Sequence, residues 1–216
     1  MSRMLAYIAD RTLTSRKAWG EALLAEFADL ARLHSDGWGS ARIDPGGEVA
    51  AAGGVEAFDL GQLDGAEASV ARILYLRFAS KGSPALPENT QPFVRDGLAF
   101  QHNGLLAPRD RALDLLAPAD VAELVGTTDS EVYFAVVRRH LRAADSDEAA
   151  RLTAIASAVN EVRAAYPDAC LNAFVLDRTG LIVVHSAGSA ATPLPAFAER
   201  GFTPEALPSG HGSDYN

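Results

Sequence analysis

The sequence is poor in cysteine: Cys170 is the single residue of this type among 216. One cysteine cannot build a disulfide framework within the chain. Cys170 directly precedes a short apolar run over residues 171–176. Free cysteine behaves as a small hydrophobic residue in such surroundings, so we predict a buried structural thiol.

Basic clusters are scarce as well. The chain has 19 Lys and Arg residues against 28 Asp and Glu, a formal net charge of −9, and no basic run is longer than the pair Arg138-Arg139. A protein that binds nucleic acid needs a basic face to neutralise phosphates. An anionic membrane surface makes the same demand. The sequence therefore argues against nucleic acid and membrane as partners.

Long hydrophobic runs are missing too. Apolar stretches such as residues 181–184 are short, whereas a membrane-spanning helix takes about 20 apolar residues. The first ten residues lack the apolar core and small-residue cleavage site of a secretory signal. We therefore expect a cytoplasmic protein.

Familiar motifs for cofactors are absent from the sequence. Gly37-Trp38-Gly39 has no third glycine in register, and no Gly-x-x-x-x-Gly-Lys phosphate loop is present. His34 and Asp36 are possible metal ligands, but no third ligand follows at a suitable spacing. We expect neither a cofactor nor a metal ion.

Apolar periodicity predicts antiparallel hairpins at both ends of the chain and helices between them. Asp44-Pro45-Gly46-Gly47 and Asp96-Gly97 mark tight turns between strands, and Ser15 is the expected N-cap of the first helix. Strands are predicted over residues 3–9, 37–43, 48–52, 72–78, 93–95, 98–101, 171–176 and 181–185, and helices over 15–33, 108–124, 129–141 and 148–165. This order predicts an α+β fold with helices covering packed sheets.

Six short blocks follow one another along the chain, each at a predicted loop or at the end of an element. They are Ser2-Arg3-Met4-Leu5-Ala6-Tyr7, His34-Ser35-Asp36-Gly37-Trp38-Gly39, Arg77-Phe78-Ala79-Ser80, Asn89-Thr90-Gln91-Pro92-Phe93, His102-Asn103-Gly104 and Thr128-Asp129-Ser130-Glu131. In this order they resemble the stand-alone bacterial type of class II glutamine amidotransferase, over roughly the first 140 residues. Any one block alone would mean little.

The resemblance implies the N-terminal-nucleophile (Ntn) hydrolase fold, a four-layer αββα sandwich of two mainly antiparallel sheets. The domain would cover residues 1–186. Residues 187–216, rich in Gly, Pro, Ala and Ser, would form an irregular C-terminal tail. Relatives usually continue into another hairpin, so the tail looks truncated and would leave a strand edge open to a partner.

The resemblance also implies roles for single residues. Asn103 and Gly104 would form the oxyanion hole, with a side-chain amide and a backbone N–H facing the tetrahedral intermediate. Arg77 would bind the substrate α-carboxylate through its paired donors. Asp129 would accept hydrogen bonds from the α-ammonium group. The amino acid would thus be held at both charged ends.

Three further residues would complete the pocket by the same resemblance. Ser80 and Gly82 would shape it through backbone contacts, and Trp38 would pack near the nucleophile. Each assignment has a simpler alternative when taken alone. Arg77 fits an ordinary surface position, Asn103-Gly104 fits a type I′ turn, and Asp129 fits the start of a helix. Only their joint order favours the functional interpretation.

The nucleophile position carries Ser2, where the family has a cysteine after the initiator methionine. Removal of Met1 would free an α-amine, with an unperturbed pKa of about 8, that can act as the general base. A hydroxyl yields almost no anion at neutral pH, whereas a thiol yields a few per cent. Three explanations stay open: an engineered substitution, a natural change to a binding subunit, or a working serine hydrolase.

Two further positions depart from the family pattern. Tyr75 and Gln91 stand where relatives often have histidine. Both lie beside residues assigned to the pocket, so they bear on the substrate.

The sequence supports two function hypotheses. In the first, the chain binds glutamine or another γ-glutamyl compound for amide hydrolysis, impaired by Ser2, and any ammonia passes to a separate synthase or partner subunit. Stand-alone bacterial relatives include a γ-glutamyl amidohydrolase, which makes such a metabolite a credible substrate. In the second, the chain is a non-catalytic scaffold that keeps the fold. The oligomeric state is not predicted.

Overall fold

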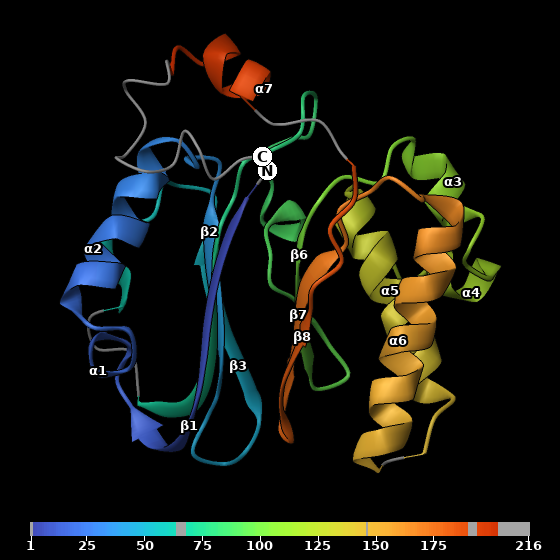
Figure 1. The fold of residues 1–216 in the computed structure, drawn as a ribbon, viewed down its shortest axis with the longest axis horizontal. Coiled ribbons are helices and arrows are strands. Elements are labelled where there is room, and N and C mark those ends of the chain that lie inside the picture. Colours follow the sequence, from blue (N-terminus) through green and yellow to red (C-terminus); the bar gives the residue numbers. More distant parts are fainter. Residues whose placement is uncertain (1, 64–67, 146, 190–193, 203–216) are drawn as a thin grey trace.

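The computed structural model describes residues 2–63, 68–145, 147–189 and 194–202. Within these ranges, two four-stranded sheets lie face to face, and helices cover the outer face of each sheet (Figure 1). The layers run helix, sheet, sheet, helix. This arrangement confirms the predicted α+β sandwich with mainly antiparallel sheets.

The first sheet has the strand order β1-β4-β2-β3 and every neighbouring pair is antiparallel. Its strands are β1 (Arg3–Leu13), β2 (Trp38–Ile43), β3 (Val49–Gly54) and β4 (Ser69–Leu76). Met4 pairs with Tyr75 and Arg3 pairs with Leu76, so the beginning of β1 lies beside the end of β4. Ser2 and Arg77 therefore meet at one end of this sheet.

The second sheet has the order β5-β6-β7-β8 and is antiparallel throughout. Its strands are β5 (Phe93–Arg95), β6 (Leu98–Asn103), β7 (Asn172–Asp177) and β8 (Gly180–Val184). The tight turn between β5 and β6 uses Asp96 and Gly97, both with positive φ, as predicted from the Asp-Gly pair. Asn103, the last residue of β6, lies opposite Asn172.

The helices are shorter and more numerous than the periodicity predicts. They are α1 (Ser15–Trp19), α2 (Glu21–Asp29), α3 (Arg109–Leu113), α4 (Pro118–Val121), α5 (Asp129–Arg142), α6 (Glu148–Ala165) and α7 (Leu194–Glu199), with 3₁₀ turns η1 (Leu30–Arg32), η2 (Leu60–Leu63) and η3 (Pro87–Asn89). The predicted helix over 15–33 is broken at Gly20, which has φ 79°. Thr14 caps α1 in place of the expected Ser15, because its side chain accepts from the Lys17 N–H.

Two other segments differ from the prediction. The helix predicted over 108–124 is split into α3 and α4, which begins with Pro118. The segment predicted as an irregular tail contains α7, and Phe197 of this helix is buried against Leu33 and Phe78. Residues 203–216, like Met1, lie outside the described residues. Tertiary contact, rather than local periodicity, holds α7 in place.

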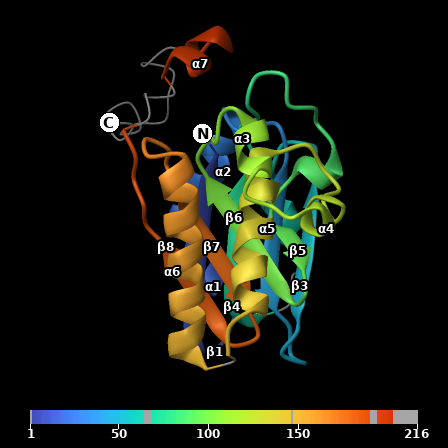
Figure 2. The same ribbon diagram turned by 90° about the vertical axis from the view of Figure 1, so that its right-hand side faces the viewer.

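Three of the hydrophobic clusters in the described chain follow the alternation of the strands. Ala71 and Ile73 of β4 pack between the two sheets, against Ala99 and Leu176 of the second sheet. Leu74 and Leu76 of β4 point to the opposite face, toward α2. Figure 2 shows α5 and α6 covering the outer face of the second sheet, where they bury the third cluster. On this alternation, Tyr75 and Arg77 face the space between the sheets.

Candidate active site

A cavity of about 740 Å³ opens at the end of the sandwich where β1 begins and β4 and β6 end. It lies on the side of α7, uppermost in Figure 1. The predicted site residues that line it are Ser2, Arg77, Ser80, Gly82, Gly104 and Asp129. Residues separated by more than 120 positions in the sequence thus share one cavity.

Ser2 lies at the inner end of this cavity and is 6% exposed. Its Oγ accepts a hydrogen bond from the Phe78 N–H at 3.1 Å and lies 2.6 Å from the phenolic oxygen of Tyr75. Phe78 comes directly after Arg77. One short segment therefore carries both the residue that holds the Ser2 hydroxyl and the arginine assigned to the substrate.

Gln91 determines the direction of the Tyr75 hydrogen bond. The Oε1 atom of Gln91 accepts from the His102 N–H, so its Nε2 donates to the Tyr75 oxygen at 3.1 Å. Burial raises the pKa of Tyr75 to about 12, so the phenol stays protonated at neutral pH. With its oxygen already accepting, Tyr75 donates its proton to Ser2 Oγ. The Ser2 oxygen then accepts two hydrogen bonds.

Arg77 is 3% exposed and is held by the loop that follows it. Its Nη2 donates to Ser83 Oγ at 2.9 Å and to the Pro84 carbonyl at 3.1 Å, while Nη1 donates to the Asp36 carbonyl at 3.2 Å. Burial lowers the pKa of Arg77, but a guanidinium stays charged in proteins. Arg77 is thus a fixed cation on the cavity wall, and an ordinary surface position is excluded.

Asp129 is the first residue of α5 but does not cap it. Thr128 is the N-cap, because its side chain accepts from the Glu131 N–H. The Asp129 carboxylate instead accepts from the Leu106 N–H at 2.6 Å and faces the cavity. Asp129 therefore begins the helix, as the simpler alternative predicts, but the capping role belongs to Thr128.

Gly104 meets its neighbours too closely for a side chain. A Cβ atom at this position would lie 1.8 Å from the Cys170 carbonyl oxygen and 2.4 Å from Nε2 of His102. Among the described residues with positive φ, neither Asn103 nor Gly104 is found, which excludes the type I′ turn. Close backbone packing, not a hairpin, requires the glycine.

His102 is buried beside Gly104 and links two walls of the cavity. The Cys170 carbonyl can only accept, so Nε2 of His102 donates to it at 3.0 Å, and Nδ1 accepts from Ser130 Oγ at 2.9 Å. Burial lowers the pKa of His102, which keeps the ring neutral. The ring therefore fixes the backbone around Gly104 without adding charge.

Comparison with known proteins identifies the family. A family model described as class-II glutamine amidotransferases matches residues 22–194. This chain belongs to the class II glutamine amidotransferases. No curated protein sequence matches the chain significantly.

Solved structures agree with the assignment of this amidotransferase. A protein of Pseudomonas aeruginosa PA01, described as a predicted glutamine amidotransferase, is 29% identical over 70% of this chain and 60% of its own, with a TM-score of 0.51. A class-II domain protein from Silicibacter pomeroyi is 19% identical over 87% of this chain and 80% of its own, with a TM-score of 0.53. The fold also matches glutamine phosphoribosylpyrophosphate amidotransferase from B. subtilis, at 16% identity, 86% and 37% coverage and a TM-score of 0.55. This chain thus spans 60% of the Pseudomonas protein and 37% of the B. subtilis enzyme.

Two residues expected in the pocket of the amidotransferase do not line the cavity. Trp38 lies on β2 and packs with Phe58 in the core beneath α2, where its Nε1 donates to Glu56 at 2.9 Å. It borders a separate small hollow beside β3. Asn103 has a buried Oδ1 atom with no hydrogen-bond partner among the described residues, and it is not among the lining residues.

Cys170 differs from its prediction as a buried structural thiol. The residue is half-buried and lines the cavity of the amidotransferase. The sequence predicts that Cys170 precedes a strand, but no local pattern indicates that it lies near the end of β6. The pairing of β6 with β7 brings it there.

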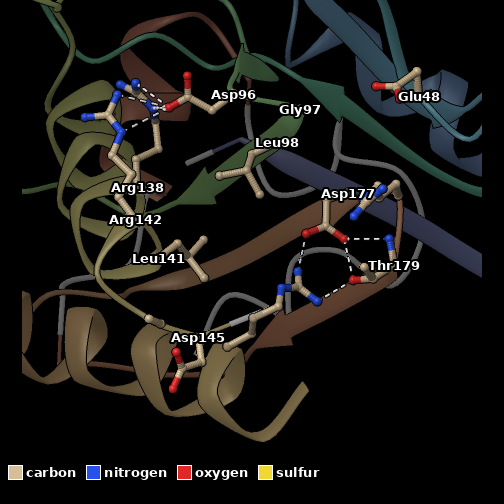
Figure 3. A pocket seen from close by; sticks show the side chains of 13 residues that line it. Glu48, Asp96, Gly97, Leu98, Arg138, Leu141, Arg142, Asp145, Asp177 and Thr179 are labelled. Carbon is tan, nitrogen blue, oxygen red and sulfur yellow. Dashed lines mark hydrogen bonds and ion pairs between the residues drawn. The ribbon is translucent and has the colours of Figure 1, made fainter. Parts of the chain in front are cut away.

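A second hollow of about 580 Å³ lies at the other end of α5 and β6 (Figure 3). Arg138 and Arg142 point at Asp96, with nitrogen–oxygen distances of 2.7 and 3.0 Å, and Arg151 pairs with Asp177. Burial raises the pKa of Asp96, but the two arginines outweigh it and hold the pKa below its ordinary value. Arg138, Arg142 and Arg151 are thus each paired with a carboxylate of this hollow.

Within the described ranges, no three His, Cys, Asp or Glu side chains gather closely enough to hold a metal ion. None of the described helices has both the length and the apolar character of a membrane span.

Proposed function

We propose that the cavity binds glutamine or another γ-glutamyl compound by both ends of its amino-acid part. The observation that carries the proposal is that Arg77 and Asp129 line the same cavity as Ser2. Within the described chain, Asp129 holds a backbone N–H and Arg77 holds carbonyl and hydroxyl oxygens, so neither charge is neutralised by a salt bridge. A zwitterionic amino acid supplies both missing partners.

The proposed reaction is hydrolysis of the γ-amide. Ser2 Oγ would bond to the carbonyl carbon of the γ-amide, the C–N bond would break, and the amine would leave with the proton given up by the Ser2 hydroxyl. Water would then hydrolyse the γ-glutamyl ester to glutamate. The α-amine of Ser2, once Met1 is removed, would act as general base. The Gly104 N–H would stabilise the oxyanion, a donor worth about 10²–10³ in rate. The amine would pass to a partner synthase subunit or to solvent.

Turnover is proposed to be slow, because the Ser2 hydroxyl is poorly disposed to attack. Phe78 N–H and the Tyr75 hydroxyl both donate to its oxygen, which occupies the lone pairs that attack needs. A serine hydroxyl also yields far less anion than a cysteine thiol near neutral pH. Binding is therefore proposed to be better preserved than catalysis.

The surroundings of Ser2 support a natural serine rather than an isolated substitution. Ser2, Tyr75 and Gln91, the three departures from the family pattern, form one continuous hydrogen-bonded chain. Exchange of a single cysteine accounts for the first of them and leaves the other two unexplained. We infer that the three residues changed together.

Calorimetry with L-glutamine and with γ-glutamyl amides tests the binding proposal. Wild-type protein is expected to bind, and Arg77→Met or Asp129→Asn to abolish binding. Arg95→Met, half-exposed and paired with Glu123 away from the cavity, serves as a control that should bind normally. Unchanged affinity in Arg77→Met would remove the assigned role.

A glutaminase assay tests the proposed impairment. Ser2→Cys is expected to raise turnover, and Ser2→Cys with Tyr75→His and Gln91→His to raise it further, because the thiol is then no longer held by a phenol. Ser2→Ala is the inactive control, and mass spectrometry of each variant establishes whether Met1 is removed. If the cysteine variants bind glutamine and lack Met1 but show no turnover, the result would favour the scaffold hypothesis.

A further inference from the structure

Asp36, which the proposed reaction leaves without a role, joins the substrate-binding segment to the end of the described chain. Its carboxylate accepts the Ala79 N–H at 2.7 Å and an Nη1 hydrogen of Arg200 at 2.7 Å. Its carbonyl accepts from Arg77, and its N–H donates to the Arg77 carbonyl at 3.3 Å. One residue thus contacts both Arg77 and the loop that contains Ser80 and Gly82.

Arg200 makes three contacts with this region. Besides Asp36, its Nη2 donates to the Ala79 carbonyl at 3.2 Å. Its guanidinium carbon lies 3.9 Å from the centre of the Phe78 ring, which is the geometry of a cation–π contact. The side chains of Arg200 and Asp36 are 30% and 24% exposed, so their ion pair is partly shielded from solvent. Shielding makes such a pair stronger than one on the open surface.

Helix α7, which directly precedes Arg200, packs against the same residue, Phe78. Phe197 of α7 is 1% exposed, and its ring lies 4.9 Å from that of Phe78, edge to face. Ala196, on the same helix, lines the cavity. The Phe78 N–H is the group that donates to Ser2 Oγ. The segment 194–200 therefore bears on both the nucleophile position and the substrate arginine.

We propose that Arg200 is a positioning residue for the γ-glutamyl site: acting through Asp36 and Ala79, it holds residues 77–79 in the conformation that binds the substrate. The inference rests on the proposed function for its effect on affinity. Arg200 lies beyond residue 194, where the match to the family model ends.

The charges of Arg200, Asp36 and Arg77 explain why the contact between the C-terminal segment and the site depends on Asp36. Arg200 alone would repel the Arg77 cation, and its charge lowers the pKa of Arg77, whereas Asp36 raises it. The Asp36 carboxylate pairs with Arg200, whereas the Arg77 guanidinium contacts only the Asp36 carbonyl. Loss of Arg200 leaves the Asp36 carboxylate and the Ala79 carbonyl to solvent, and frees the start of the 79–84 loop. We expect weaker binding of substrate, with the remainder of the fold intact.

The test combines amide hydrogen exchange without ligand and calorimetry with L-glutamine. In Arg200→Met, exchange over residues 77–84 is expected to quicken and glutamine affinity to fall about tenfold, as for one charge-assisted hydrogen bond. Glu199→Gln is the matched control, because Glu199 directly precedes Arg200 and pairs only loosely with Lys81, at 3.8 Å. It should match the wild type in both measurements.

A double-mutant cycle separates positioning from general stability. If Arg200 acts through Asp36, Arg200→Met adds little to the loss already caused by Asp36→Asn. Arg200→Lys keeps the charge but not the two-pronged contact, and is expected to recover part of the affinity. In a Ser2→Cys background, Arg200→Met should raise KM and leave kcat nearly unchanged.

The outcomes distinguish this inference from the proposed function. Wild-type affinity in Arg200→Met, or additive losses in the cycle, would overturn the inference while the proposed function stands. If the wild type binds no γ-glutamyl compound, the proposed function fails, and hydrogen exchange in Arg200→Met alone tests the inference. Unchanged exchange over residues 77–84 would then overturn the positioning role of Arg200, and faster exchange would support it.

Discussion

The two hollows at opposite ends of the sandwich are built from similar charged residues and use them differently. In the hollow of Figure 3, Arg138 and Arg142 bind Asp96, and each cation is met by a carboxylate of the same chain. In the cavity beside Ser2, Arg77 and Asp129 are held by backbone and hydroxyl groups that leave their charges uncompensated. The first arrangement is complete in itself. The second is completed by a ligand.

The difference shows that the pairing of charges, rather than their number, marks a functional site. Holding a fixed, unmatched charge costs stability, because burial disfavours the charged form. A ligand of opposite charge offsets this loss of stability when it binds. Removal of an arginine should therefore lower stability at one end of the molecule and ligand affinity at the other.

Removal of one arginine from each end should give the largest effects. Arg138→Met is expected to lower the free energy of unfolding, because its nearly buried guanidinium loses the ion pairs with Asp96 and Glu123, which keep Arg142 as a partner. The Arg138 side chain is 5% exposed. Arg77→Met should cost little stability but weaken glutamine binding at least about a hundredfold, as expected for a buried charge contact. Urea unfolding and calorimetry on both variants measure the two effects.

The comparison fails if the effects do not separate. Glutamine affinity lost in a folded Arg138→Met protein would mean that the two hollows are coupled. A large loss of stability in Arg77→Met, with affinity retained, would make Arg77 a structural residue.

Backbone packing at the cavity gives the next effect in size. Gly104→Ala would bring a methyl group within 1.8 Å of the Cys170 carbonyl, and overpacking of this kind costs about 1–3 kcal/mol or more. We expect both lower stability and loss of glutamine binding, measured by urea unfolding and calorimetry. Gly46→Ala is the control, since that turn offers only the Asp44 carboxylate at 3.2 Å. Equal losses in the two variants would contradict the special role of Gly104.

The sequence predicts the strands well because their signals are local. The turns at Asp44–Gly47 and Asp96-Gly97 and the apolar alternation lie within a few residues of the strands that they define. Helix α6 is predicted over the residues it occupies. The break at Gly20 was readable as an isolated glycine, whereas α7 had no readable signal because Phe197 is held by distant residues.

Some features of the candidate site are likewise predicted from the sequence, and others depend on the tertiary fold. The order of motifs predicts the residues that share the cavity, because the family match carries information about the fold. It does not place Trp38, whose neighbours are set by the core beneath α2. The Arg200–Asp36 contact joins residues 164 positions apart, and no local pattern signals such a pair. The Tyr75–Gln91 contact likewise depends on how two strands and a loop meet.

A pH series tests the cavity end of α5. Burial lowers the pKa of His102 below its ordinary value of 6.5. The unfolded chain therefore takes up the proton first, so the stability due to neutral His102 is present above pH 6.5 and is lost as pH falls below it. Urea unfolding between pH 7.5 and 5 should show a shallower slope in His102→Gln than in the wild type. An unchanged slope in His102→Gln would contradict the neutral ring.

The smallest effect comes from the residues that cap α5 and α6 at their N-terminal ends. Thr128 accepts from the Glu131 N–H, and Asp147 accepts from the Ala150 N–H, so each is a capping residue at one helix start. Replacing either by alanine should cost about 1 kcal/mol of unfolding free energy. Thr128 directly precedes Asp129, so Thr128→Ala should also weaken glutamine binding severalfold, whereas Asp147→Ala should not, since α6 begins away from the cavity. Equal affinities in the two variants would mean that the Leu106 N–H alone positions Asp129, and that the start of α5 contributes stability but no binding geometry.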